Sequence, residues 1–265
     1  MQPRLKETEI LNKSKLAPEV YYLELSAPEL AERAQPGQFL HLKCGREGYD
    51  PLLRRPLSIF SIDVSRGTLG LLFRIRGRGT ELLASRKPGE KLEVLGPAGR
   101  GFKLKDQDKR LLVVAGGMGV APLASLAQLA ITEGRQVTML LGAVNSEELV
   151  ALNFLSSLGI KPRLATDDGS RGFKGQVTSL AERLLKVEDF DHAYACGPRP
   201  MLRTLAQLAQ DRGLVLQISL EERMGCGVGA CLTCACAVHD GRERIYQRVC
   251  SEGPVFSADE VIFDD

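Results

Sequence analysis

Hydrophobic and polar positions follow two different rhythms along this chain. In the N-terminal part, short stretches rich in Val, Ile, Leu, Tyr and Phe are separated by Gly, Pro or Asp. Short strands with turn residues at this spacing are typical of a small antiparallel barrel. One helix is expected to interrupt them, with Thr80 as its N-cap and Gly89 as its stop. The pattern predicts an antiparallel β-barrel over residues 1–103, with strands in segments 19–27, 37–45, 54–63, 67–77 and 90–99.

From residue 104 to residue 218, apolar strands alternate with amphipathic helices. Leu123, Leu126, Ala127 and Ala130 recur at the spacing of one helix face. Alternation of strand and helix over this length favours a parallel sheet covered on both faces. The fold class is therefore mixed, with a doubly wound α/β nucleotide domain after the barrel.

The last segment, residues 219–265, shows little periodicity and contains most of the cysteines. It is too short to be stable through a hydrophobic core of its own. A covalent link, a metal or a cofactor is expected to hold this small C-terminal subdomain together.

Composition narrows the possible functions. The chain has 265 residues, 44% hydrophobic and 26% charged, which is typical of a globular protein. A net charge of +2 does not favour nucleic acid as a partner. Neither a membrane span nor a secretory signal is visible, so a cytoplasmic location is expected. In that compartment thiols stay reduced, and an odd count of seven cysteines fits a disulfide framework poorly.

Four cysteines follow the spacing C-x4-C-x2-C-x15-C. This is the plant-type arrangement for a 2Fe–2S cluster. Glycines interleave with the first three cysteines and allow the loop to curl, so that backbone N–H groups can face the sulfurs. A zinc site of four cysteines and a thioredoxin-like pair remain alternatives, although the second close zinc knuckle and the preceding strand that they require are missing. The expected ligands are Cys226, Cys231, Cys234 and Cys250, and Cys236 is left out.

A second candidate site is the glycine-rich turn in "LLVVAGGMGVAPLASL". Gly116, Gly117 and Gly119 would let the backbone approach a pyrophosphate at the start of a helix. Pro122 stands where the usual dinucleotide fingerprint has its last glycine, a position at which a helix tolerates proline. An ordinary glycine turn of an α/β domain is the alternative.

Two further stretches are candidates for ligand contacts. Cys196 in "ACGPRPM" ends a strand at the sheet edge where doubly wound folds bind ligands, although a buried inert cysteine is the alternative. In "RRPLSIF", Arg55 could bind a diphosphate, while strand alternation directs Arg55 and Ser58 to opposite faces. The glycines of "GRGTELL" precede a helix and offer another anion site. A surface arginine and an ordinary turn would also explain these stretches.

The chain as a whole resembles the electron-transfer subunits of class 1B (NAD-dependent) dihydroorotate dehydrogenases, within the ferredoxin–NADP reductase superfamily. The resemblance lies in "LLRRPLSI", "GPAGRGF", "GGMGVAPL", "ACGPRPM" and "SLEERMGCGVGACLTCAC…RVCSEGPVF". The cysteine motif is the most specific of these, because related NADH-dependent reductases usually have Asp at the position of Cys226.

The resemblance implies an FAD site on the barrel and a pyridine-nucleotide site on the sheet. Arg55 would contact the FAD pyrophosphate and Ser58 the flavin N5, and Cys196 would lie near the nicotinamide. The residues implied for FAD are Arg55, Pro56, Leu57, Ser58, Leu72, Phe73, Arg74, Gly79 and Thr80. Those implied for the nucleotide are Gly117, Gly119, Pro122, Cys196, Gly197 and Pro198.

The resemblance also implies a function: electrons from a dihydroorotate-oxidising FMN partner pass through a 2Fe–2S cluster and FAD to NAD⁺, with two copies of each subunit in the complex. The absence of Arg or Lys near Glu147 and Glu148 favours NAD over NADP. Two other functions remain open. The same relay could serve a hydrogenase or a sulfur or ferredoxin reductase, or the chain could be a nucleotide-binding redox sensor.

Overall fold

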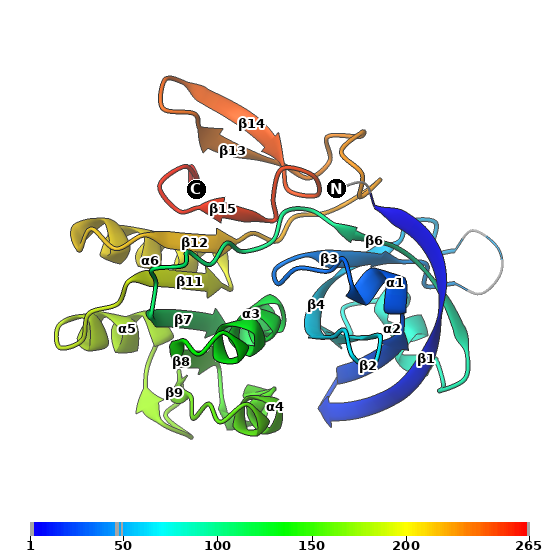
Figure 1. Cartoon of the computed structure of the whole chain (residues 1–265), viewed down its shortest axis with the longest axis horizontal. Coiled ribbons are helices and arrows are strands. Elements are labelled where there is room, and N and C mark those ends of the chain that lie inside the picture. The colour runs from blue at the N-terminus through cyan, green and yellow to red at the C-terminus, as the bar shows by residue number, and fades with distance from the viewer. Residues whose placement is uncertain (1–2, 46–47, 49, 264–265) are drawn as a thin grey trace.

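The computed structural model describes residues 3–45, 48 and 50–263. Its N-terminal part is a closed six-stranded barrel in the order β1-β2-β5-β4-β3-β6, with antiparallel pairing throughout (Figure 1). Alternate side chains fill the barrel, so that Leu23, Leu25, Leu69 and Leu71 are fully buried. The predicted antiparallel barrel is confirmed. Its strands are β1 (Arg4–Ala17), β2 (Val20–Ser26), β3 (Phe39–Leu42), β4 (Arg55–Asp63), β5 (Thr68–Arg74) and β6 (Lys91–Ala98).

Two helices interrupt the barrel strands, α1 (Pro28–Ala31) and α2 (Arg78–Ser85). The start predicted for the second helix is corrected: it begins at Arg78, two residues before Thr80. The Thr80 hydroxyl still caps the start of the helix, since it accepts hydrogen bonds from the N–H groups of Arg76 at 2.8 Å and Gly77 at 3.3 Å. A threonine in the first turn can thus cap a helix that begins upstream of it.

The second part of the chain is a seven-stranded sheet in the order β10-β9-β8-β7-β11-β12-β15. All neighbouring pairs are parallel except β12 and β15. The doubly wound α/β prediction is therefore confirmed for this part. The strands are β7 (Arg110–Gly116), β8 (Gln136–Ala143), β9 (Arg163–Thr166), β10 (Phe173–Lys174), β11 (His192–Cys196), β12 (Leu216–Ser219) and β15 (Val255–Ser257).

Helices cover both faces of this sheet (Figure 1). One buried cluster joins one sheet face to α3 and α4, and a second joins the other face to α5 and α6. Burial on both faces explains why the central strands are almost continuously apolar. The helices are α3 (Val120–Thr132), α4 (Leu152–Ser157), α5 (Val177–Leu185) and α6 (Arg199–Asp211), with short 3₁₀ turns η1 (Gly117–Gly119) and η2 (Ser146–Glu148).

Helix α3 also connects the sheet to the barrel. The Ser125 hydroxyl donates to the Ile59 carbonyl of β4 at 2.9 Å. The Gln128 side-chain amide bonds both backbone groups of Ile62, at 3.0 and 3.2 Å. The helix that follows the glycine turn is thus fixed against the strand that carries Arg55 and Ser58.

The C-terminal segment wraps back over both parts. A hairpin of β13 (Ala235–His239) and β14 (Arg244–Arg248) follows the cysteine loop, and β15 then pairs with β12 of the sheet. Phe39 of the barrel shares a buried cluster with Cys234, Cys236 and Cys250. The segment therefore buries its apolar side chains against the sheet and the barrel. Among the described residues, no helix is both long and apolar enough to cross a membrane.

Candidate functional site

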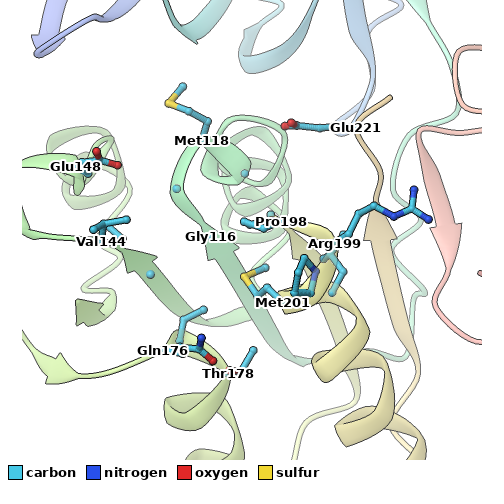
Figure 2. Close-up of a pocket in the computed structure, with 18 of the residues that line it drawn as sticks. Gly116, Met118, Val144, Glu148, Gln176, Thr178, Pro198, Arg199, Met201 and Glu221 are labelled. Carbon is cyan, nitrogen blue, oxygen red and sulfur yellow. The ribbon is translucent and has the colours of Figure 1, made fainter. Parts of the chain in front are cut away.

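A cleft of about 590 Å³ opens at the carboxyl ends of β7, β8 and β11, where the sheet faces the barrel (Figure 2). Doubly wound sheets bind ligands at this edge. Four of the residues implied for the nucleotide line the cleft: Gly117, Gly119, Gly197 and Pro198. The glycine turn and the turn after β11 are thereby brought together, although about 80 residues separate them in the chain.

Gly119 is required by the close approach of two backbones. A Cβ atom there would lie 2.1 Å from the Cys196 carbonyl oxygen. Gly119 has φ of −59°, an ordinary helical value, so the requirement is steric rather than conformational. The turn after β7 can therefore lie directly against the end of β11, and both turns contribute backbone to one cleft.

Cys196 and Pro122 do not line the cleft. The Cys196 side chain is fully buried, and this burial raises the pKa of its thiol well above the usual value. Pro122 lies in the first turn of α3, where its carbonyl accepts a hydrogen bond from the Ser125 hydroxyl. The structure brings the chain turn that follows Cys196 to the cleft, and the position of Cys196 near the nicotinamide stays a prediction.

Several cleft residues were missed in the sequence. Met118 and Glu221 lie across the cleft from Gln176 and Thr178, at the start of α5 (Figure 2). Surrounding protein raises the pKa of Glu221, and the nearby Arg76 opposes this in part. These residues come from distant segments with no shared spacing. One usable signal was that Glu221 follows the end of β12 closely, at the ligand-binding edge.

Arg74 links the barrel to the sheet at the cleft wall. Its guanidinium forms an ion pair with Glu148 in η2 at 3.2 Å. Both side chains line the cleft. Glu148 is one of the two carboxylates from which the sequence analysis favoured NAD over NADP. In the fold, this carboxylate is paired with an arginine of the barrel.

A guanidinium and the start of a helix meet on the barrel beside α2. A Cβ atom at Gly79 would lie 2.8 Å from Nε of Arg55, so the arginine side chain lies directly against the first turn of the helix. Arg55 is half-buried, and its Nη1 donates to the Leu53 carbonyl at 2.7 Å. A guanidinium next to helix N–H groups is a favourable combination for binding a phosphate.

The other residues implied for FAD lie on β4 and β5. Pro56 and Ser58 pair with His41 and Phe39 of β3, so these four side chains share the outer face of the barrel. Leu72 packs in the cluster shared with α3. Phe73 instead belongs to the barrel core and stacks on Tyr21, with ring centroids 6.1 Å apart. Phe73 can therefore contact a ligand outside the barrel through its backbone.

The cysteine loop directs backbone N–H groups at the sulfurs. The Cys226 sulfur accepts from Val228 at 3.4 Å and from Ala230 at 3.3 Å. The Cys231 sulfur accepts from the Cys226 N–H at 3.4 Å, and the Cys250 sulfur from the Gly229 N–H at 3.2 Å. Gly227 and Gly229 have φ of +70° and +83°, which lets the loop present these donors.

The four thiols form two neighbouring pairs. Cys226 and Cys231 interact in the loop, and the Cys250 N–H donates to the Cys234 sulfur at 3.4 Å. Hydrogen bonding by Thr233 lowers the pKa of the exposed Cys231 thiol to about 6. Burial, together with Cys234, raises the pKa of Cys250 to about 12. Within the described residues, no three His, Cys, Asp or Glu side chains converge closely enough to bind a single metal ion.

This donor set fits a binuclear iron–sulfur cluster. Such a cluster requires two thiolates for each iron and N–H donors towards the sulfurs, and the loop has both. Arg248 supports the arrangement, since its Nη1 donates to the Gly229 carbonyl at 2.8 Å while its Nε donates to Glu252 at 3.0 Å. Cys236 is buried in β13, and burial raises the pKa of its thiol to about 11.

Two family descriptions match the chain. Residues 221–262 match the iron–sulfur cluster binding domain of dihydroorotate dehydrogenase B, and residues 113–207 match the oxidoreductase NAD-binding domain. The electron transfer subunit of dihydroorotate dehydrogenase B (NAD(+)) from Desulforamulus reducens is 42% identical over 249 residues, which cover 94% of this chain and 95% of the relative.

Solved structures show the same architecture. An NADH-dependent reduced ferredoxin–NADP oxidoreductase, studied for flavin-based electron bifurcation, aligns with a TM-score of 0.85 at 28% identity. The alignment covers 97% of this chain and 90% of that one. A ferredoxin NADP⁺ reductase from Neisseria gonorrhoeae with bound FAD and NADP shares the fold, with a TM-score of 0.66 at 22% identity, over 83% of this chain and 94% of that one.

Proposed function

Because this chain belongs to the family of electron transfer subunits of dihydroorotate dehydrogenase B (NAD(+)), we propose that its barrel, cleft and cysteine loop bind FAD, NAD and a 2Fe–2S cluster in one electron relay. The function of the family, electron transfer between a dihydroorotate dehydrogenase and NAD⁺, is the function of this chain. We propose that residues 1–103 bind FAD, residues 104–218 bind NAD and residues 219–265 bind the cluster.

The proposed cluster ligands are Cys226, Cys231, Cys234 and Cys250. Their arrangement in two pairs supports this assignment, since each pair of thiolates would bind one iron. The observation that carries the proposal is the set of backbone N–H donors from Cys226 to Ala230 that already face these sulfurs.

The proposed FAD site combines the outer barrel face with the start of α2. Arg55, Gly79 and Thr80 would hold the pyrophosphate, and Pro56 and Ser58 would face the flavin. Leu57, Leu72, Phe73 and Arg74 would complete the wall, with Phe73 contributing backbone. The position of Arg55 against Gly79 supports this assignment.

The cleft would position NAD⁺ against the flavin. The nucleotide would be contacted by the backbone of Gly117, Gly119, Gly197 and Pro198. The hydrogen bonds from α3 to β4 would fix the distance between the nucleotide and the flavin. FAD exchanges electrons singly or in pairs and the cluster exchanges them singly, which allows a two-electron hydride acceptor to be linked to a one-electron centre. The residues of this chain have to bind and orient NAD⁺ and the flavin and to exclude water from them. No general base is required for the hydride step.

The partner is the catalytic subunit of dihydroorotate dehydrogenase B. We propose that it carries FMN, that two copies of each subunit assemble, and that the complex is cytoplasmic. The surface of the cysteine loop supports docking beside the cluster, because Cys231, Val228 and Leu232 are exposed there. Exposed apolar side chains next to a redox centre are suited to a protein partner.

The test is anaerobic purification of the chain with its partner, followed by flavin and iron analysis and a visible spectrum. We expect about two irons per chain and FAD bound to it, both reduced by NADH and by dihydroorotate. One zinc per chain without flavin would refute the relay. Reduction by NADH without any reduction by dihydroorotate would instead point to a different partner enzyme.

A further inference from the structure

His41 has no clear role in the site described above, yet it is placed where the barrel meets the cysteine loop. His41 is 1% exposed, and its ring nitrogens make no well-formed hydrogen bond among the described residues, although the backbones of Arg54 and Cys226 lie close enough to interact with them. Burial of an imidazole with such weak hydrogen bonding is costly, which points to a structural role for the ring.

The ring lies on the barrel face that carries the proposed flavin contacts. His41 pairs directly with Pro56, and Phe39 pairs with Ser58, so the four side chains lie on the same side of β3 and β4. Leu40 and Leu42, which alternate with them, are buried in the barrel core. His41 is therefore attached to the flavin-binding strand pair and points away from the barrel interior.

On its other side, the ring contacts the cysteine loop. A Cβ atom at Gly227 would lie 2.3 Å from Nδ1 of His41 and 2.9 Å from Cε1. Gly227 is the residue after Cys226, it is buried, and its φ is +70°. The loop backbone thus rests directly on the imidazole, with no side chain between them.

We propose that His41 is a positioning residue whose ring acts as a spacer between the flavin-binding strand and the cluster loop, and so fixes the distance over which electrons pass. This inference rests on the proposed function. The ring is rigid and closely packed against the loop, whereas the apolar side chains of Val228 and Leu232 in the same loop are exposed. Removal of the ring leaves a gap into which the glycine-rich loop can move.

The test uses the complete complex with its cofactors and three variants. In His41→Ala, reduction of FAD by NADH should keep its rate, while reduction of the cluster, followed by rapid-freeze EPR, should slow by about tenfold. His41→Leu, which restores bulk without nitrogens, should recover most of that rate. His239→Gln, a change at an exposed histidine of the same C-terminal segment, should behave as the wild type.

Iron and FAD contents are measured for each variant. Loss of iron from His41→Ala with retention of FAD also supports the inference, because the loop then fails to keep its shape. A wild-type cluster rate and iron content in His41→Ala overturns it, as does a rate in His41→Leu as slow as in His41→Ala. If His41→Ala does not fold, His41→Val gives the same comparison at a smaller truncation. Absence of a cluster from the wild type would refute the proposed function itself.

Discussion

The nucleotide cleft and the cysteine loop are stabilised by different forces. The cleft is formed by the ends of packed strands: Leu111, Leu112, Val113, Val114 and Ala115 of β7 are all buried. The loop is held by N–H donors directed at sulfur and by glycines with positive φ. The hydrophobic core alone is sufficient to form the cleft, whereas the loop also depends on the group that it binds.

The cluster ligands should show the largest effect. Cys250→Ser should remove nearly all iron and loosen the C-terminal segment, because a hydroxyl does not replace a buried thiolate in a structural site. NAD binding in the cleft should survive. Iron analysis and nucleotide titration measure the two regions separately. Cys236→Ala is the matched control and should keep its iron, and a loss equal to that in Cys250→Ser would break the assignment of four ligands.

The core of the sheet should show the next largest effect. Leu140 of β8 is fully buried, and Leu140→Ala should lower the free energy of unfolding by about 2–5 kcal/mol, through lost transfer energy and a cavity. Leu232, which is 63% exposed in the cysteine loop, provides the comparison. Leu232→Ala should change stability by less than about 0.5 kcal/mol. Urea denaturation measures both, and equal losses would contradict the contrast between the two regions.

Gly119→Ala should separate cleft geometry from overall stability. The new Cβ would meet the Cys196 carbonyl at 2.1 Å, so α3 or β11 has to shift, at a cost of about 1–3 kcal/mol. NADH binding should weaken, while iron content stays at the wild-type value. A nucleotide titration alongside iron analysis checks this. Unchanged NADH affinity would mean that the glycine turn does not contact the nucleotide.

The Arg248–Glu252 pair should show the smallest effect, with a defined pH dependence. Arg248 lowers the pKa of Glu252 to about 2, below its usual value of 4.5. The carboxylate therefore stabilises the folded state above pH 4.5, and this stabilisation is lost as the pH falls towards 2. Because the pair is partly exposed, Glu252→Gln should cost about 1 kcal/mol at pH 7.

Urea denaturation at pH 7, 5 and 3 measures this dependence. The difference between the wild type and Glu252→Gln should shrink between pH 5 and pH 3, because Glu252 takes up a proton in the unfolded chain, with its usual pKa of 4.5, while the folded protein still keeps the carboxylate charged. Glu182→Gln, which removes an exposed partner of Lys186 on α5, is the control and should have a smaller effect at every pH. A difference that is independent of pH would show that the charge on Glu252 does not stabilise the loop.

The local sequence pattern identified some residues of the site and missed others. The cysteine spacing identified a set of thiols that the fold does bring together, and the glycine turn identified one wall of the cleft. Glu221 and His41 were not found, because each acquires its position from a contact with a distant segment. The position of Cys196 beside the nucleotide stays a prediction, although the burial of its side chain at the end of β11 was decided by packing from other segments.

The sequence by itself determined the elements and their class, because hydrophobic period, turn residues and cysteine spacing are local properties of a chain. It also determined the chemistry available to each segment. The tertiary structure decided which segments meet: α3 on β4, β15 on β12, Arg74 with Glu148, and the His41 ring against Gly227. These contacts depend on packing between residues far apart in the chain, which no local period encodes.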